Sequence, residues 1–516
     1  MWLIRRVKRP NGAVPQRMKV NANIVWWNIL CAVMVVIASS DASSAQPLTP
    51  ALCPSGTPPF NIHPTFRAFV SGQPGIPLLR KTIDTQAYPD ALCNDGSSAV
   101  MYIRPANAAY AANPIIQPSR KWLIFIDGGG GCRNADDCLL TRWCSGGDAP
   151  FDRAGKMSSL GAWDAIHSPG GIFELTPPAP AVNNFADYNH VLVHYCSSDN
   201  WIGSATQVGI TASTGTTYDI QFQGEAIVNA VFSTLLAGPT DADPVATQRF
   251  YATPLPNLQD ASEIIIGGDS AGSGGVRHHI DRLREDVLTP AVADPALKVS
   301  GLLDAGATPG MWDPVNPLIS WADPNSPADY RDYLLTEVEP VSRDFWGAND
   351  SALDQSCLDP LYAGDHNLVG SHPQVCYDTT YTLLNHITTP LFLRMDMNDP
   401  LGKRPYGRWN LYLSTDDYWA AQYNQLDLLR GYTAGSGGLE SPLDALGIQG
   451  PNCGRHVAVL TNDGFFRHHV AGPGVPPHSF HDLLVNWLNG VGPGMDTQQI
   501  QMDNLGVGTY SPSICP

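Results

Sequence analysis

The amino-acid sequence predicts an α/β fold, with a mostly parallel sheet, helices on both of its faces and long covering insertions. The first observation is a set of short, nearly continuous apolar runs, which suit strands buried on both faces; they lie at 121–127, 190–196, 263–268, 299–306 and 390–396. The second is a set of helical candidates, at 223–236, 275–288 and 479–490. Alternation of strand and helix favours a layered α/β architecture.

The connections between these elements are long and rich in proline and glycine, at 46–62, 168–185, 238–258 and 306–330. In a compact domain, loops of this length tend to cover a site or to be poorly ordered. The 516 residues could build one large core or two ordinary ones. No internal repeat and no clean linker divides the chain, so we expect one domain over 46–516 with loop insertions.

The first 45 residues carry basic side chains, then the apolar stretch "IVWWNILCAVMVVIASS", then the small residues of "DASSA". This order predicts a secretory signal peptide over 1–45, cut after Ala45. A retained membrane anchor is the alternative, although the apolar run is slightly shorter than a bilayer span. We expect a secreted chain, extracellular or periplasmic, with no membrane contact after cleavage.

The mature chain is strongly acidic. Without residues 1–45 it keeps 24 basic and 47 acidic residues, a formal net charge of −23. Nucleic acid and anionic membranes are therefore disfavoured as partners. The same charge repels polyanionic polymers, although salt screens this repulsion beyond about 10 Å at 0.1 M.

Cysteine usage agrees with export. Ten of the eleven cysteines follow the signal segment, an even set suited to disulfides in an oxidising compartment. The spacing of Cys132, Cys138 and Cys144 is the one hint of a metal site. It lacks the paired cysteines and patterned histidines of zinc modules, so no metal is expected.

The segment "EIIIGGDSAGSGG" (263–275) places a serine between a strand candidate and a helix candidate. Gly268 to Gly272 fit G-x-S-x-G around Ser270, which in this context is typical of the nucleophile elbow of an α/β-hydrolase-like fold. The glycines remove side chains that would collide across the turn, and the N–H of Ala271 would face a developing oxyanion. A glycine-rich turn capped by a serine is the structural alternative.

A second glycine run, Gly128 to Gly131, follows the strand candidate 121–127. Exposed backbone amides at such a place can supply the other half of an oxyanion hole, as glycine runs do in esterases. A phosphate-binding loop would require G-K-[ST]. This run continues with Cys132-Arg133-Asn134 instead, which argues against phosphate binding.

A nucleophilic serine needs a base and an orienting acid, and in this fold the acid precedes the histidine along the chain. The strand candidate 390–396 is followed closely by Asp399, so Asp396 and Asp399 are both candidate acids. The residues alone do not choose among five later histidines: His456, His468, His469, His478 and His481. Asp304, at another strand end, is more simply a cap of the next turn.

Several stretches together resemble the pectin acetylesterase and Notum family of secreted serine hydrolases. They are "WLIFIDGGGGC" (122–132), "HYCSSDNWIGS" (194–204), "GGDSAGSGGV" (267–276), "LLDAGATPGMW" (302–312), "PLFLRMDMND" (390–399) and "CGRHVAVL" (453–460). The resemblance covers about two-thirds of the chain. Within "YCSSD" (195–199), Cys196 is expected to anchor a disulfide, and a place at the mouth of the active site is the alternative.

The resemblance implies positions for the site residues. The nucleophile is Ser270, the acid is Asp399 and the base is His456, with His468 or His469 as the alternatives. The oxyanion amides are those of Gly129, Gly130 and Ala271. Gly130 and Gly131 stand where relatives often carry bulky aromatic residues, so the pocket wall near the oxyanion is expected to differ.

The same resemblance implies a cofactor-free carboxylic ester hydrolase acting through a Ser-His-Asp triad. Acetylated polysaccharide is the first expected substrate, and a fatty acyl ester on a protein or a small ester is the alternative. A hormone-sensitive-lipase-like esterase shares "GDSAG", but that family expects a histidine where Asp127 stands. A relative that binds glycan or lipid without cleaving it is the rival from another class. The sequence does not give the oligomeric state.

Overall fold

A computed structural model describes much of the chain between residues 46 and 515. The described residues are 46–47, 78–106, 119–144, 155–159, 166–167, 169–215, 217–238, 257–306, 338, 340–348, 352–358, 376–401, 422–423, 425–426, 429, 446–472, 475–490, 500–502 and 515. They all belong to one compact unit, residues 44–516. The predicted signal peptide 1–45 and most of the predicted loops 46–62, 238–258 and 306–330 lie outside the described residues.

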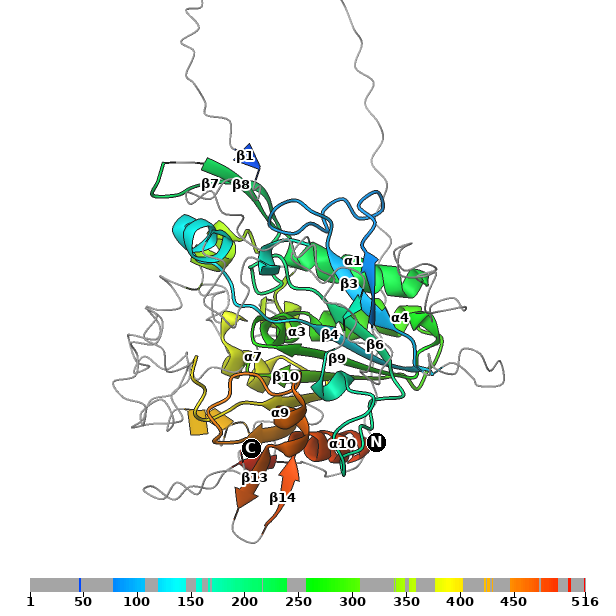
Figure 1. Ribbon diagram of the computed structural model, residues 1–516. Helices are drawn as coiled ribbons and strands as arrows, with labels where there is room; N and C mark the ends of the chain where they lie inside the picture. The colour runs from blue at the N-terminus through cyan, green and yellow to red at the C-terminus, as the bar shows by residue number, and fades with distance from the viewer. Residues whose placement is uncertain are drawn as a thin grey trace, which may run out of the picture. The chain divides into compact units, whose positions relative to one another are not determined.

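A single large sheet organises the described part of the chain (Figure 1). Its ten strands are β2 (Leu78–Thr82), β3 (Val100–Arg104), β4 (Lys121–Ile126), β5 (Ile166–His167), β6 (Asn189–Val193), β9 (Glu263–Asp269), β10 (Lys298–Asp304), β11 (Leu391–Arg394), β12 (Leu446–Gly450) and β15 (Ile500–Met502). Their order across the sheet is β15-β12-β11-β10-β9-β4-β6-β3-β2-β5. Neighbours from β15 to β6 are parallel, and the pairs of β3 and β2 are antiparallel.

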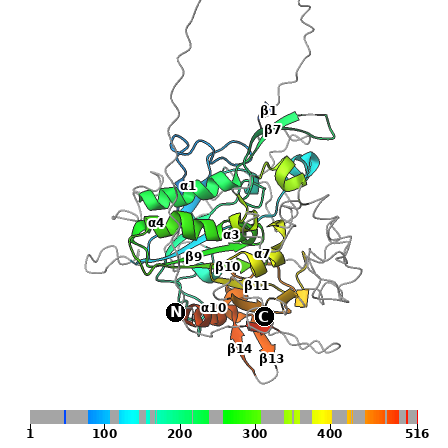
Figure 2. The ribbon, with the colours of Figure 1, turned by 180° about the vertical axis from the view of Figure 1, so that it is seen from behind.

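The helices lie on both faces of this sheet, as predicted (Figure 2). They are α1 (Gly224–Ala237), α3 (Ala271–Arg282), α4 (Thr289–Ala291), α6 (Gln355–Leu358), α7 (Thr379–Asn385), α9 (Asn462–Arg467) and α10 (Phe480–Gly490). Short π-helices add η3 (Asp137–Trp143), η7 (Leu283–Leu288) and η9 (Pro340–Phe345), and 3-10 turns add η4 (Gly155–Met157), η5 (Gly171–Phe173) and η6 (Leu258–Asp260). The mostly parallel α/β fold is therefore confirmed.

Alternation along the central strands builds two cores. In β4, Ile124 and Ile126 pack into one cluster with α1, α3 and α7, whereas Leu123 and Phe125 pack into another with α9 and α10. Successive strand residues point to opposite faces. Because both faces are buried, the residues of β4 form a continuous apolar run, and this run is the pattern that predicted the strand.

Two smaller elements accompany the main sheet. Strands β1 (Gln46–Pro47), β7 (Ala205–Thr211) and β8 (Thr217–Phe222) form a three-stranded sheet, and β13 (His469–Gly472) pairs with β14 (Val475–Ser479). Among the described residues, no helix is both long and apolar enough to cross a membrane.

Disulfides confirm the reading of the cysteines. Four bonds join described residues: Cys93–Cys196, Cys132–Cys138, Cys357–Cys376 and Cys453–Cys515. Cys144 is disulfide-bonded as well. The spacing that hinted at a metal site thus contains a disulfide between its first two members.

A buried histidine on α3 gives a testable pH dependence of stability. His279 Nε2 donates to the carbonyl oxygen of Trp201 at 2.7 Å, and its Nδ1 faces Arg282 Nη2 at 3.3 Å. Burial, aided by Arg282, lowers the pKa of His279 to about 3. Below pH 6.5 His279 is therefore protonated in the unfolded chain but stays neutral in the folded chain. The free energy of unfolding consequently falls as the pH falls.

We expect the wild type to lose about 3 kcal/mol more stability between pH 7 and pH 4 than His279→Gln. Denaturant unfolding of both proteins at several pH values measures this difference. Comparing two proteins cancels the contributions of the other buried titratable groups. Stability curves that run parallel over this range would contradict the neutral, buried state of His279.

Candidate active site

Ser270 stands at the turn between β9 and α3, the predicted strand-to-helix corner. Its backbone has φ 50° and ψ −116°, a strained conformation that the surroundings must hold in place. The N–H of Ser270 donates to the carbonyl oxygen of Asp304 at 2.8 Å, and Ser273 Oγ lies 2.8 Å from the same oxygen. The neighbouring strand β10 thus anchors the turn at the carboxyl edge of the sheet, where open α/β sheets bind ligands.

The glycines on either side of Ser270 permit close backbone contacts. A Cβ on Gly268 would lie 2.4 Å from the carbonyl carbon of Gly272, so the predicted collision across the turn is confirmed. A Cβ on Gly272 would meet a different neighbour, the carbonyl oxygen of Ile126 at 2.0 Å. Gly272 therefore lets α3 approach the end of β4.

A hydrogen-bonded chain of three side chains includes Ser270. His456 Nε2 lies 2.8 Å from Ser270 Oγ, and His456 Nδ1 lies 2.6 Å from Asp399 Oδ2. The Asp399 side chain is 2% exposed and that of His456 is 16% exposed. With Nδ1–H donating to the carboxylate, Nε2 is free to accept the hydroxyl proton. Of the two acids and five histidines that the sequence left open, the structure brings Asp399 and His456 to Ser270.

Asp396 has a different place, under the loop that carries His456. Its carboxylate accepts the backbone N–H groups of Cys453, Gly454 and Arg455 at 3.0–3.1 Å. Burial raises the pKa of Asp396, and the charge of a neighbouring arginine opposes this rise. The disulfide from Cys453 to Cys515 fixes the same loop covalently. Asp396 thus shapes the histidine loop instead of bonding to the histidine.

That neighbouring arginine, Arg394, connects the parts of the site. Its Nη1 donates to Asp304 Oδ1 at 3.1 Å and to the carbonyl oxygens of Arg455 and His456 at 3.1 and 2.9 Å, while Nη2 contacts Asp396 at 3.2 Å. The Arg394 side chain is 1% exposed. Our reading of the sequence missed it, although a charge inside the apolar run "PLFLRMD" was a visible signal.

Asp304 also supports the histidine loop. Its Oδ2 accepts the N–H groups of Ala458 and Val459 at 2.7 and 2.8 Å. Asp304 therefore caps the turn after His456, and the turn after its own strand, where the sequence predicted its capping role, lies outside the described residues. The sequence could not show this, since the two segments are far apart along the chain.

The glycine run leaves β4 beside Ser270. A Cβ on Gly128 would lie 3.0 Å from Ser270 Cβ. The N–H of Gly128 points toward two carboxylates, with Asp127 Oδ1 and Asp269 Oδ1 each at 3.0 Å. Asp127 also pairs with Lys156. Burial, strengthened by the charge of Asp127, raises the pKa of Asp269 well above its usual value.

The predicted oxyanion amides are available in the described part of the chain. No acceptor among the described residues bonds the N–H groups of Gly129, Gly130 or Ala271. Two aromatic rings back the glycine run: a Cβ on Gly129 would lie 2.7 Å from the ring of Tyr195, and one on Gly131 would lie 2.6 Å from the indole of Trp346. The run thus carries no side chains of its own and is packed between rings from distant segments.

The "YCSSD" segment supports this packing. Cys196 forms the expected disulfide, with Cys93. Asp199 accepts the N–H groups of Trp201 and Gly224 at 3.0 and 2.8 Å, and burial raises the pKa of Asp199 to about 6. Trp201 Nε1 donates to the carbonyl oxygen of Asp127 at 3.0 Å. Asp199 thus holds Trp201, and Trp201 in turn holds the residue that precedes the glycine run.

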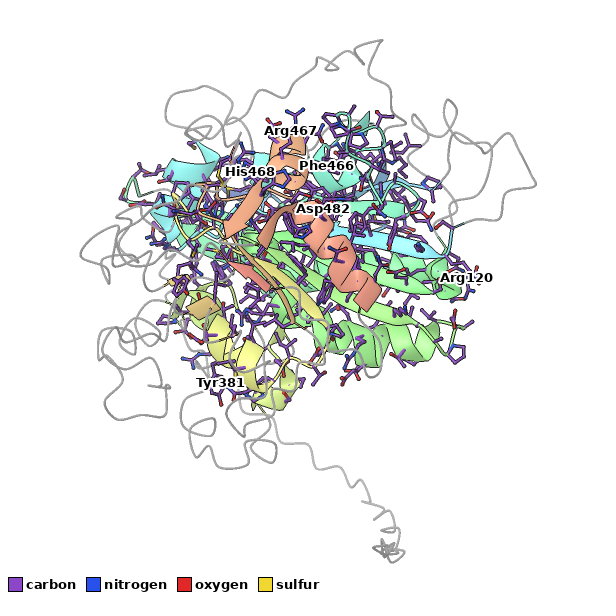
Figure 3. The ribbon with its side chains drawn as sticks, turned by 90° about the horizontal axis from the view of Figure 1, so that it is seen from below. Arg120, Tyr381, Phe466, Arg467, His468 and Asp482 are labelled. Atoms are coloured by element: carbon purple, nitrogen blue, oxygen red, sulfur yellow. A yellow bond between two sulfur atoms is a disulfide. The ribbon has the colours of Figure 1, made fainter. Side chains whose placement is uncertain are left out.

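The alternative base candidates, His468 and His469, do not bond to Ser270 in the described residues. Phe466, Arg467, His468 and Asp482 group around α9 and the start of α10 (Figure 3). Burial lowers the pKa of His468 to about 4.

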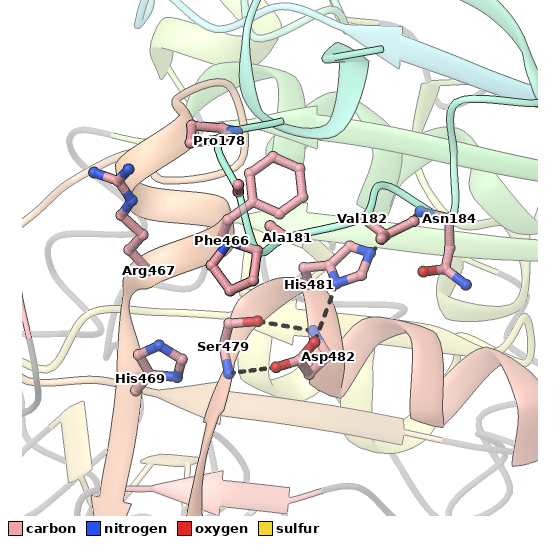
Figure 4. Close-up of a pocket in the computed structure, with 12 residues that line it drawn as sticks. Pro178, Ala181, Val182, Asn184, Phe466, Arg467, His469, Ser479, His481 and Asp482 are labelled. Carbon is pink, nitrogen blue, oxygen red and sulfur yellow. Dashed lines mark hydrogen bonds and ion pairs between the residues drawn. The ribbon is translucent and has the colours of Figure 1, made fainter. Parts of the chain in front are cut away.

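His469 and His481 line a separate cavity of about 480 Å³ beside α9 and α10 (Figure 4). Asp482 bonds His481 Nδ1 there at 3.2 Å, and the hydrogen bond to His481 lowers the pKa of Asp482 to about 2. Prolines and Val182 of one loop complete the wall. The lining includes none of Ser270, His456 and Asp399, so the two sites are distinct.

Comparison with known proteins identifies relatives of this chain. Its residues 77–245 match the family described as Pectinacetylesterase. It is 28% identical over 214 residues to palmitoleoyl-protein carboxylesterase notum1 of Xenopus laevis, an alignment that covers 42% of this chain and 34% of the relative. The human protein NOTUM is 27% identical over the same shares, and that of Schmidtea mediterranea is 31% identical over 37% of this chain and 28% of the relative. The alignments thus span about a third of these relatives.

Solved structures agree on the fold. The Wnt deacylase Notum from Drosophila superposes with a TM-score of 0.53 at 21% sequence identity, covering 80% of this chain and 93% of that one. A second crystal form gives a TM-score of 0.54, with 86% and 99% covered. At this identity the likeness concerns the fold, and it agrees with the mostly parallel α/β architecture described above. Over residues 77–245 the chain is thus similar to the family described as Pectinacetylesterase, and over 42% of its length it is similar to the Notum palmitoleoyl-protein carboxylesterases.

Proposed function

We propose that this chain is a secreted serine carboxylic-ester hydrolase that removes acetyl groups from a polysaccharide. One observation carries the proposal: the continuous hydrogen-bond chain from Asp399 through His456 to Ser270 Oγ, with distances of 2.6 and 2.8 Å. A serine activated by a neighbouring base, with that base oriented by an acid, is the arrangement of nucleophilic acyl transfer. Export is supported by the four described disulfides.

In the proposed reaction, Ser270 Oγ attacks the ester carbonyl carbon while His456 Nε2 takes the hydroxyl proton. The N–H groups of Gly129, Gly130 and Ala271 donate to the resulting oxyanion. The bond to the alcohol oxygen then breaks, and His456 returns the proton to this oxygen as the alcohol leaves. Water then attacks the acyl carbon of the acyl-enzyme while His456 Nε2 takes its proton. The bond to Ser270 Oγ breaks, His456 returns the proton to this oxygen, and acetate is released. Side chains and backbone groups of the protein carry out every proton transfer and stabilise the oxyanion in this scheme.

Acetylated polysaccharide is the first substrate class because the matching family is named for acetyl esters of pectin. The net charge of −23 calculated for the chain after residue 45 opposes close approach of polyanionic pectin. A weakly charged acetylated glycan is therefore a better substrate than pectin itself. No nucleic acid and no membrane is proposed as a partner.

Hydrolysis of a fatty acyl ester is the second candidate, favoured by the similarity to Notum proteins, whose name states palmitoleoyl-protein carboxylesterase activity. A small-ester esterase of the hormone-sensitive-lipase type is less favoured. Asp127 stands where that type expects a histidine, and here it accepts the N–H of Gly128 and pairs with Lys156.

Two assays of the chain without residues 1–45 test the proposal. In the first, p-nitrophenyl esters from acetyl to palmitoyl are compared, and kcat/KM is expected to fall roughly 10-fold or more between acetyl and octanoyl. In the second, acetate release from acetylated xylan is expected to exceed that from acetylated pectin at low salt, with a difference that shrinks as salt is added. Faster hydrolysis of the palmitoyl ester would favour the second candidate.

A fluorophosphonate probe separates an enzyme from a relative that only binds glycan or lipid. The probe reacts with an activated serine, so the proposal expects one label, on Ser270. A folded chain that neither labels nor hydrolyses any ester of the panel would refute the hydrolase function.

A further inference from the structure

Arg142 takes an unusual set of hydrogen-bond partners next to the candidate active site. Its Nη1 donates to the carbonyl oxygens of Gly129 and Gly130 at 3.1 and 3.3 Å, and its Nη2 donates to that of Gly131 at 2.7 Å. One guanidinium therefore contacts three consecutive carbonyls of the glycine run. Arg142 is 5% exposed.

The chain brings Arg142 back to this run by a short covalent loop. The run ends at Cys132, which is bonded to Cys138, and the π-helix η3 then presents Arg142 four residues later. The planar guanidinium has several donors in a fixed fork, so it can serve neighbouring acceptors at once. A lysine ammonium at the same place would be a point donor without this fork.

Peptide geometry gives these bonds a consequence on the opposite side of the run. In a planar trans peptide the C=O and N–H groups point in opposite directions. Fixing the carbonyls of Gly129 and Gly130 on Arg142 therefore turns the N–H groups of Gly130 and Gly131 away from it. Neither N–H has an acceptor among the described residues. The third peptide differs, because Cys132 N–H donates to the carbonyl oxygen of Ser198 at 2.9 Å.

Free N–H groups stabilise an oxyanion only when they are held in advance where charge develops. A run of four glycines has no side chains to restrict its peptide planes. The run also begins beside Ser270, as the 3.0 Å approach of a Gly128 Cβ to Ser270 Cβ shows. An external group must therefore orient these peptides, and the described residue that contacts three of their carbonyls is Arg142.

We propose that Arg142 is a positioning residue of the oxyanion hole, acting through the carbonyls of Gly129, Gly130 and Gly131. This inference rests on the proposed hydrolase function. Arg142 does not touch the substrate. It selects the peptide orientation in which the amide of Gly130 faces the reacting carbonyl oxygen.

The test compares Arg142→Lys with a matched control, Arg104→Lys. Arg104 is 4% exposed, and its guanidinium also donates to a backbone carbonyl, that of Phe173 at 2.5 Å. Its place in the sheet is different: Arg104 pairs with His190, and His190 pairs with Leu123 near the start of β4, at the strand end opposite the glycine run. Both substitutions remove a buried guanidinium, but of the two arginines it is Arg142 that contacts the glycine run.

For Arg142→Lys we expect kcat on p-nitrophenyl acetate, per active site titrated with the fluorophosphonate probe, to fall roughly 10- to 100-fold. KM should stay within about twofold, because the lost interaction forms in the transition state. The inhibition constant of a methyl trifluoromethyl ketone, whose adduct with the serine carries an oxyanion, should rise by the same factor as kcat falls. Arg104→Lys should change none of these values per titrated site.

A merely structural role predicts a different pattern, in which the fraction of titratable sites falls and each remaining site keeps the wild-type kcat. That pattern, or a rise in KM alone, would overturn the proposal. If Arg142→Lys does not fold, Arg142→Ala refolded with methylguanidinium replaces it, and turnover that does not depend on methylguanidinium would also overturn the proposal. A wild type without turnover or label would refute the hydrolase function itself, and the role of Arg142 with it.

Discussion

Replacing Ser270 with alanine is expected to lower kcat on p-nitrophenyl acetate by about 10⁶-fold. The substitution removes the oxygen that forms the acyl-enzyme, and it leaves His456 with no hydroxyl to deprotonate. The fold should persist, because Ser270 Oγ bonds to His456 among the described residues and that ring is partly exposed. Steady-state kinetics and the unfolding midpoint measure the two effects separately.

Ser273 provides a matched control within the same glycine-rich segment. Its hydroxyl is buried and lies 2.7 Å from the carbonyl oxygen of Gly268 and 2.8 Å from that of Asp304. Ser273→Ala should therefore cost about 1 kcal/mol of stability and leave most of the turnover. If Ser270→Ala kept full activity while Ser273→Ala lost it, the nucleophile would be wrongly assigned.

The parts of the fold that could be predicted are those in which local pattern and burial coincide. The runs at 121–127 and 263–268 are buried on both faces and correspond to β4 and β9 within two residues. Strand β12 was missed because "LGIQG" is short and contains two glycines, which weaken a strand. The antiparallel strands β2 and β3 were also missed, since a short apolar segment does not specify its pairing partner.

The residues of the candidate site also fall into those with a local signal in the sequence and those without one. Ser270 could be predicted because the elbow is a local motif that lies between a strand and a helix. The choice of Asp399 over Asp396 came from family resemblance, because contacts between distant segments carry no local signal. Arg142 and Arg394 were missed for this reason: a buried arginine that orients backbone carbonyls is recognised only when the segments it joins are seen together.

The difference between locally predictable and unpredictable residues follows from which contacts fix each of them in the structure. Ser270 is fixed by its own strand and helix, whereas the loop of His456 is fixed by the carboxylates of Asp304 and Asp396 and by the guanidinium of Arg394. Asp304 and Arg394 lie on β10 and β11, Asp396 follows β11, and all three side chains are almost fully buried. A buried charge is costly unless it is paired, so removing one member would disturb the whole histidine loop.

The largest expected effect on stability comes from Gly272→Ala. The new Cβ would lie 2.0 Å from the carbonyl oxygen of Ile126. This carbonyl cannot move aside, because β4 is paired on both edges, with β6 and with β9. Helix α3 must therefore shift away from the sheet, and overpacking of this kind outweighs the gain of up to about 1 kcal/mol from replacing a helical glycine. We expect a loss of about 3 kcal/mol in the free energy of unfolding.

Gly274→Ala provides the matched control, because it makes the same substitution two residues further along α3. A Cβ on Gly274 would meet nothing within 4 Å, so the helix gains alanine without a clash. Stability should rise by about 0.5–1 kcal/mol. Opposite signs for these neighbouring substitutions in urea unfolding would identify the contact with Ile126 as the cause. Equal losses at both positions would show instead that α3 tolerates no alanine in its first turns, and that the approach to β4 does not explain why Gly272 is needed.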